Sequence, residues 1–207
     1  MIAFFMLAAG CAVLDWLAVA DGRRRLEYVC KPAVIVALIG AAFTLVPADD
    51  AQRALFVAAL VLSLAGDVFL MLPRDLFVPG LAAFLLAHLA YIAGFVTEGP
   101  TLGAAALSIL AVTALSVPIG TRILRALRTS SPRLVPPVAV YMFVISWMLA
   151  AALAAGDIRA VVGALLFYAS DALIAVNRFV VPLSWARPAV MVTYHLAQGA
   201  LVISLLS

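Results

Sequence analysis

Long apolar runs alternate with short polar breaks along the whole chain. Each run is about as long as a membrane-crossing helix, because a bilayer core of roughly 30 Å takes about 20 residues at about 1.5 Å per residue. The breaks combine charge with Pro or Gly, as in Asp21–Arg25 and Gly156–Arg159, and the longest is expected at Arg122–Pro137. The pattern predicts eight helices, over residues 2–20, 29–46, 54–72, 77–96, 101–120, 135–155, 160–177 and 188–206.

Composition assigns the chain to the membrane proteins. Hydrophobic residues make up 67% and charged residues 11% of the sequence, with a mean hydropathy of +1.22, whereas soluble domains are about 45–50% apolar. Eight spans fill the 207 residues, so we expect a single all-α transmembrane domain over residues 1–207. The net charge of +3 indicates no nucleic-acid partner, because the basic residues lie in short breaks. Cys11 and Cys30 fit no disulfide or metal-ligand spacing.

The basic residues also predict an orientation, because Lys and Arg are enriched in cytoplasmic loops. Of the 13 Lys and Arg residues, all but Arg53 and Arg159 lie on the side of the breaks that follow the first, third, fifth and seventh helices. We therefore expect those breaks in the cytoplasm and both termini outside, in a bacterial plasma membrane.

Two acids and two histidines lie inside the apolar runs. They are Asp67, His88, Asp171 and His195. A charge near a bilayer centre costs roughly 2.5–3.5 kcal/mol on insertion scales and normally faces a cavity or a partner. Counted from the predicted helix ends, all four lie between roughly 8 Å below the cytoplasmic face and the midplane. This shared layer indicates a functional site. The alternatives are structural carboxylates bonded to hydroxyls such as those of Ser63 and Ser170, and histidines in interhelical hydrogen bonds.

The spacing of these residues predicts an internal repeat. Asp67 and Asp171 are 104 residues apart, and His88 and His195 are 107 apart. Repeats over about 1–100 and 101–207 would each hold four helices, so they would be parallel and related by an axis along the membrane normal. Such an axis would bring the pair of Asp67 and His88 and the pair of Asp171 and His195 into one central intramembrane cavity.

Other polar residues extend the predicted site. Tyr91 follows His88 by three residues and shares its helix face, and Tyr194 adjoins His195. Lys31, Asn177 and Arg178 are expected at the cytoplasmic interface, where the two cations would form a rim that binds a lipid phosphate above the carboxylates. The alternative for these cations is a role in topology, with side chains that snorkel to the interface.

Several of these residues stand in short sequence blocks. The blocks are Lys31-Pro32, Gly66-Asp67-Val-Phe-Leu-Met, Ala87-His88-Leu-Ala-Tyr91, Ser170-Asp171, Asn177-Arg178-Phe179 and Tyr194-His195-Leu-Ala-Gln198. Taken together, they resemble the YhhN-type lysoplasmalogenase family of small eight-span membrane proteins. The resemblance covers the whole chain. It implies hydrolysis of the vinyl-ether bond of a lysoplasmalogen to a fatty aldehyde and a glycerophospho-ethanolamine or -choline, and it implies no cofactor.

The polar residues suit that chemistry. Vinyl ethers hydrolyse by acid: a proton goes to the β-carbon, an oxocarbenium ion forms, and water adds, which parallels glycoside hydrolysis. We expect Asp67 and Asp171 to share one proton and to act as a coupled acid and base. His88 and His195 would orient the carboxyls or relay protons, with Tyr91 and Tyr194 as hydrogen-bond donors.

Two other classes of function stay open on the sequence alone. Two Asp and two His could hold zinc in a metal-dependent lipid hydrolase. A small proton-coupled transporter would also place acids near the midplane of a repeated fold.

Overall fold

The computed structural model describes residues 1–97 and 99–206, and it is helical throughout, with no strand in the described part. Glu98, in the predicted break after the fourth helix, lies outside the described residues. The helices are α1 (Ile2–Ala20), α2 (Arg24–Thr44), α3 (Asp50–Met71), α4 (Phe77–Val96), α5 (Leu102–Ser130), the 3-10 helix η1 (Pro132–Leu134), α6 (Val135–Ala155), α7 (Ile158–Ala175), the π-helix η2 (Val176–Val180) and α8 (Ala186–Ser204).

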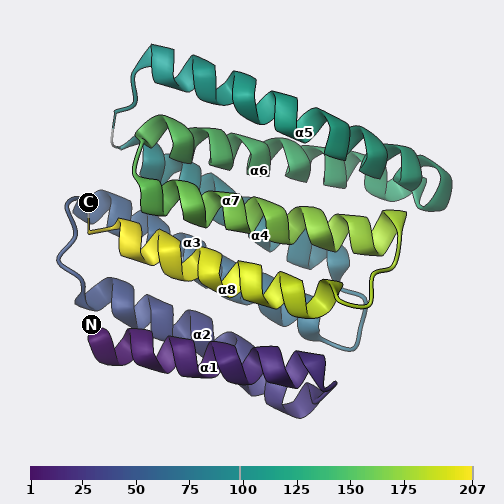
Figure 1. The fold of residues 1–207 in the computed structure, drawn as a ribbon, viewed down its shortest axis with the longest axis horizontal. Helices are drawn as coiled ribbons and strands as arrows, with labels where there is room; N and C mark the ends of the chain where they lie inside the picture. Colours follow the sequence, from purple (N-terminus) through teal and green to yellow (C-terminus); the bar gives the residue numbers. More distant parts are fainter. Residues whose placement is uncertain (98, 207) are drawn as a thin grey trace.

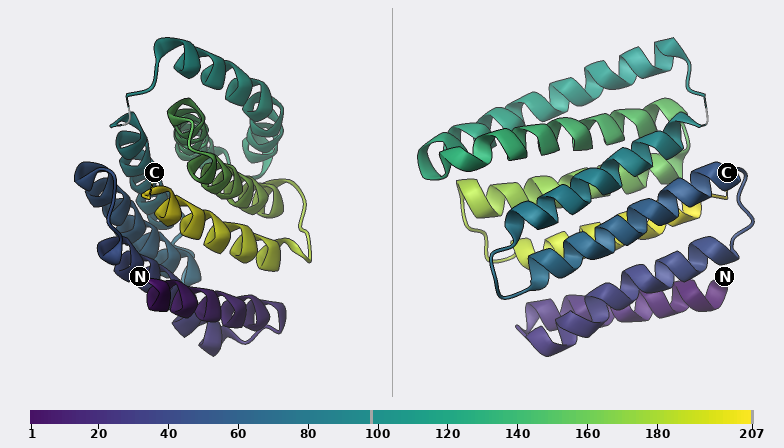
Figure 2. Two further views of the ribbon diagram at one scale, coloured as in Figure 1. Left: turned by 60° about the vertical axis from the view of Figure 1, so that its left-hand side comes forward. Right: turned by 180° about the vertical axis from the view of Figure 1, so that it is seen from behind.

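The helices run up and down as four antiparallel hairpins, α1/α2, α3/α4, α5/α6 and α7/α8, with α1 and α5 at opposite edges (Figure 1). Packing of α4 on α6, α2 on α3 and α8 on α1 joins the hairpins into one bundle (Figure 2). Both termini lie at the same end of the bundle (Figure 1). The two halves therefore have the same up-and-down order, although the internal repeat itself stays a prediction.

Seven of the helices in the described residues are long and apolar enough to cross a membrane. α8 is not among them, because Arg187, His195 and Gln198 lower its hydropathy. Large hydrophobic side chains such as Leu107, Phe143 and Leu196 point outward and are about half exposed or more, as on a lipid-facing surface. The prediction of an all-α integral membrane protein is confirmed.

Three predicted boundaries were wrong by four residues or more. α3 begins at Asp50 rather than at residue 54, and the other two boundaries lie at the end that carries the basic residues. α2 begins at Arg24, five residues before the predicted start, so Lys31 lies two turns inside the helix rather than at its end. α5 continues through the predicted break to Ser130. Ile123 and Leu127 on this extension are fully buried against α4 and α6, while the arginines face outward. Hydropathy averaged over a window is low for such an amphipathic turn, whereas the spacing of its apolar residues at three to four positions identifies it as helical.

The end of α7 has a local irregularity. Its last turns widen into the π-helix η2, which carries Asn177, Arg178 and Phe179. Single π-turns inside helices are rare and recur at functional sites. Here the turn brings Phe179 against Phe77 at the start of α4, with the ring centroids 5.6 Å apart.

Candidate active site

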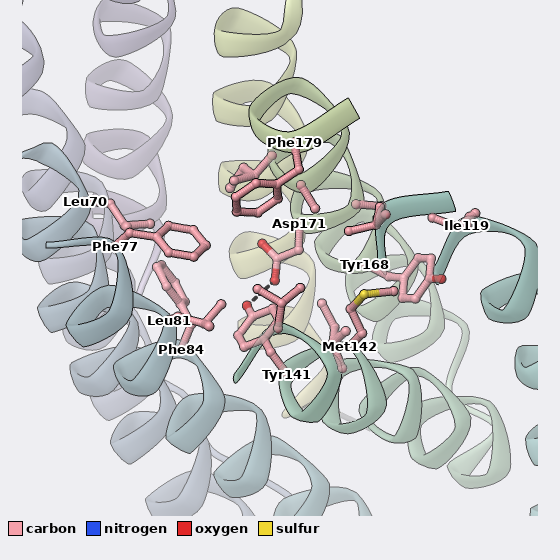
Figure 3. Close-up of a pocket in the computed structure, with 16 residues that line it drawn as sticks. Leu70, Phe77, Leu81, Phe84, Ile119, Tyr141, Met142, Tyr168, Asp171 and Phe179 are labelled. Carbon is pink, nitrogen blue, oxygen red and sulfur yellow. Dashed lines mark hydrogen bonds between the residues drawn. The ribbon is translucent and has the colours of Figure 1, made fainter. Parts of the chain in front are cut away.

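An apolar pocket lies between α3, α4, α5, α6 and α7. Within the described part of the chain, its lining includes one charged residue, Asp171. The cavity has a volume of about 60 Å³, enough for a few water molecules. Phe77 and Phe179 lie at one end, Tyr141 lies at the other, and the Asp171 carboxyl lies between them (Figure 3). A carboxyl group is thus held in a space lined mostly by hydrocarbon and aromatic side chains.

Two side chains contact the Asp171 carboxyl. The Tyr141 hydroxyl donates a hydrogen bond to Oδ2, shown as a dashed line in Figure 3. Nε2 of His88 lies 3.7 Å from the same oxygen, a close approach but longer than a hydrogen bond. The Asp171 side chain is 11% exposed and lines the pocket.

The ring of His88 has a defined tautomer. Nδ1 faces the carbonyl oxygen of Phe84, one turn earlier on α4, and must carry the proton in order to donate to it. Nε2 is then the basic nitrogen of the neutral ring, and it has no hydrogen-bond partner among the described residues. Phe167 and Tyr141 pack edge-on against the ring, at 4.7 and 5.4 Å between centroids. His88 therefore aims an unoccupied acceptor at Asp171.

Asp67 lies in a different polar network. Its Oδ1 is 3.0 Å from Nζ of Lys31, and its Oδ2 accepts a 2.7 Å hydrogen bond from Tyr194. The network continues from Tyr194 to Gln198, at 3.3 Å, and from Gln198 to Tyr91, at 2.5 Å. The predicted position of Lys31 at the interface was wrong, because its side chain is only 6% exposed and its ammonium is paired with Asp67.

The predicted pairs of Asp67 with His88 and of Asp171 with His195 do not form, and the two carboxyls lie in separate surroundings. The aromatic rings of Phe84 and Phe167 pack against Tyr194 on the Asp67 side, and Phe167 also packs against His88 on the Asp171 side. Among the described residues no hydrogen bond joins Asp67 to Asp171, and Asp67 does not line the Asp171 pocket. His88 faces Asp171 instead of Asp67, so the observed His–Asp contact joins the two halves of the chain.

His195 contacts neither carboxyl. Its Nδ1 accepts a 3.1 Å hydrogen bond from the Trp16 indole, and its ring lines an apolar groove of about 520 Å³ between α1, α2, α7 and α8. Neither Ser63 nor Ser170, the hydroxyls considered as structural partners of the acids, donates a hydrogen bond to a carboxyl in the described residues. Ser170 donates to the carbonyl of Val190, and Ser63 has no partner. The reading of serine-bonded structural carboxylates is therefore not supported.

The expected rim is reduced to Arg178. Its guanidinium stacks on the Phe77 ring at 4.3 Å and lies 5.7 Å from the Phe179 ring, the two rings at one end of the pocket. It also pairs with Asp75, in the turn between α3 and α4, at 2.9 and 3.1 Å. Asn177 instead accepts a 2.7 Å hydrogen bond from the amide of Leu183 and so fixes the turn after η2.

Sequence reasoning missed Tyr141, the hydrogen-bond donor to Asp171. Its only signal was a phenol in an apolar run, one helix away from the acid in sequence. It also passed over Trp16 as a partner of His195. Within the described residues, no group of three or more His, Cys, Asp or Glu side chains lies close enough to hold a metal ion.

Comparison with known proteins gives a consistent result. The model of the YhhN family matches residues 26–205. The human lysoplasmalogenase TMEM86B is 36% identical over 86% of this chain and 73% of its own length. The mouse lysoplasmalogenase TMEM86B is 33% identical over 98% and 84%, and the lysoplasmalogenase of Mycobacterium bovis is 31% identical over 89% and 81%. No solved structure matches the chain. Since the family model covers most of the chain, from α2 to α8, the protein belongs to the YhhN family.

Proposed function

We propose that this membrane protein is a lysoplasmalogenase, which hydrolyses the vinyl ether of a lysoplasmalogen to a fatty aldehyde and a glycerophospho-ethanolamine or -choline. The curated relatives that match most of the chain carry this name. The observation that carries the proposal for this chain is the carboxyl of Asp171 in an apolar pocket, with Tyr141 and His88 beside it.

Asp171 is the proposed proton donor. No Lys or Arg in the described residues pairs with its carboxyl, and its surroundings are mostly hydrocarbon and aromatic. A carboxylic acid in such a site can keep its proton until a substrate accepts it. The proton goes to the β-carbon of the vinyl ether, the alkene electron pair forms the new C–H bond, and the ether oxygen stabilises the resulting oxocarbenium ion. The Asp171 carboxylate is left beside that cation.

His88 is the proposed base of the second step. The bond from Nδ1 to Phe84 leaves Nε2 free to take a proton from the attacking water, whose oxygen bonds to the cationic carbon. As the bond between the hemiacetal carbon and the glycerol oxygen breaks, the hemiacetal hydroxyl gives up its proton, the glycerol oxygen takes up a proton, and the aldehyde leaves. The 3.7 Å between Nε2 and Asp171 allows His88 to return the proton to the carboxyl and restore the donor.

Arg178 is the proposed phosphate contact. It lies seven residues after Asp171, which corresponds to roughly 10 Å along a helix, and it stacks on the rings at the end of the pocket. A lysophospholipid whose phosphate meets this guanidinium can extend its sn-1 ether toward Asp171.

Asp67 has a positioning role in this proposal. Its charge is balanced by Lys31, and with Tyr194, Gln198 and Tyr91 it forms a buried network that joins α2, α3, α4 and α8. A fully bonded network of this kind fixes helix positions. Through Phe84 and Phe167 it supports the wall on which His88 packs.

The orientation with both termini outside, in a bacterial plasma membrane, belongs to the same proposal. The two termini share one end of the bundle, and the loops α1–α2, α3–α4, α5–α6 and α7–α8 lie at the other (Figure 1). All the Lys and Arg residues except Arg53 and Arg159 lie in or near these loops. The lysophospholipid would then enter from the cytoplasmic leaflet.

The test is release of aldehyde by the purified protein from a lysoplasmalogen and from its saturated ether analogue. We expect aldehyde from the vinyl ether alone, and loss of it in Asp171→Asn. Equal reaction of both ethers, or no reaction of either, would contradict the proposal. A parallel assay with a chelator tests the zinc-hydrolase alternative, since a zinc enzyme would lose activity. Transport of a solute without release of aldehyde would instead favour a transporter.

A further inference from the structure

We infer that Asp75 is a specificity-determining residue for the head group, and that it pairs with the ammonium of a zwitterionic lysophospholipid while Arg178 binds the phosphate. The inference rests on the proposed function and adds to it the recognition of the second charge of the substrate. It follows from the place of the ion pair between Asp75 and Arg178 relative to the Asp171 pocket.

The ion pair lies where the pocket meets the surface. Arg178 is held in place by the rings of Phe77 and Phe179, both of which line the pocket that contains Asp171. Both Asp75 oxygens lie within 3.1 Å of the same guanidinium nitrogen. The Asp75 side chain is 71% exposed and that of Arg178 is 38% exposed, so both charges are open to a ligand.

The two charges match a zwitterionic head group in sign and order. A phosphate joined by a short ethyl linker to an ammonium presents an anion and a cation close together. The phosphate would replace the Asp75 carboxylate on part of the Arg178 fork, which has further N–H donors. Asp75 would then be free to pair with the ammonium. The ion pair between Asp75 and Arg178 would thus be exchanged for ion pairs with the head group, rather than simply lost.

This arrangement makes a prediction that depends on sign. For an ammonium-bearing substrate, Asp75 supplies an attraction. For an alkenyl glycerophosphate without the ammonium, the same carboxylate competes with the phosphate for Arg178. Removal of the Asp75 charge should therefore weaken binding of the first substrate and strengthen binding of the second.

The experiment compares KM for alkenyl glycerophosphoethanolamine and alkenyl glycerophosphate, on wild type, Asp75→Asn and the control Asp21→Asn. Asp21 is also an exposed carboxylate in a loop at this end of the bundle, paired with Arg23 at 3.1 Å, but it does not contact Arg178. Exposed ion pairs contribute about 0.2–1 kcal/mol, or up to about fivefold in affinity. We expect Asp75→Asn to raise KM about threefold for the zwitterion and to lower it about threefold for the phosphate ester, with the ratio unchanged in Asp21→Asn.

A structural role for Asp75 would move both KM values in the same direction and would overturn the inference. The same change in ratio in Asp21→Asn would also overturn it, because general surface charge would then be the cause. If wild type releases no aldehyde from either substrate, the proposed function fails. If wild type hydrolyses both substrates and Asp75→Asn does not change the head-group preference, only the inference about Asp75 fails.

Discussion

The buried pair of Lys31 and Asp67 allows a quantitative test of the core of the bundle. Its side chains are 6% and 2% exposed, and the charged atoms are 3.0 Å apart. At that distance, and with an effective dielectric constant of about 20, the attraction is about 5 kcal/mol. Removal of one partner leaves a buried charge without its counterion, which typically costs 3–5 kcal/mol. We expect Lys31→Met, which keeps an unbranched side chain one atom shorter, to lower the free energy of unfolding by about 4 kcal/mol.

The assay is thermal unfolding in one detergent, followed by circular dichroism. A loss of about 4 kcal/mol corresponds to a fall in Tm of roughly 10 °C for a chain of this size. The double variant Lys31→Met/Asp67→Asn should recover most of that loss, because the amide still accepts from Tyr194 without a charge. The control is Arg23→Met, which breaks an exposed pair at 3.1 Å and should change Tm by no more than about 2 °C. A single variant as stable as wild type, or a double variant no better than the single one, would refute the reasoning.

Four further predictions concern the pocket and the topology. Asp171→Asn should lower kcat by about 10²–10⁴ while the protein still inserts, because the proton donor is lost, and activity within tenfold of wild type would exclude that role. Arg178→Ala should raise KM for a lysoplasmalogen at nearly constant kcat and leave a phosphate-free alkenyl glycerol unaffected; equal losses on both would point to folding instead. Gly66→Ala should reduce activity, because its Cβ would lie 2.6 Å from the Phe84 ring beside the pocket, whereas Gly10→Ala meets nothing within 4 Å and should be neutral in a side-by-side assay. A reporter that is active only in the cytoplasm should stay inactive at the C-terminus, and its activity there would reverse the orientation.

The helices themselves could be predicted from the sequence where lipid surrounds them. The long apolar runs predicted the first and last residues of α1, α4 and α6 correctly. In hydrocarbon, the backbone of such a run can satisfy its hydrogen bonds only as a helix. The ends of α2 and α5 could not be predicted in the same way. Their terminal turns are amphipathic, with arginines outside and residues such as Ile123 buried, so an average of hydropathy reads them as breaks.

For the site, the sequence indicated which residues are unusual but not which of them meet. Asp171 and His88 stand out as polar groups in apolar runs, and the structure brings them together. The expected pairing failed because it assumed that each acid meets the histidine of its own half. That choice depends on how α4, α6 and α7 cross, and local sequence does not encode it. The same limit explains why Lys31 was assigned to the interface when its partner, Asp67, lies on α3.

If His88 and Asp171 exchange a proton as proposed, their approach couples the chemistry to the membrane itself. One group is on α4 and the other on α7, so the 3.7 Å between them is set by the relative height and tilt of two membrane-crossing helices. Helices adjust their tilt when the bilayer becomes thicker or thinner. A shift of one helix past the other by a fraction of a turn, at about 1.5 Å per residue, would change the distance over which the proton moves. Under the proposed mechanism, the lipid composition around the bundle would therefore act on the position of the proton acceptor as well as on the supply of substrate.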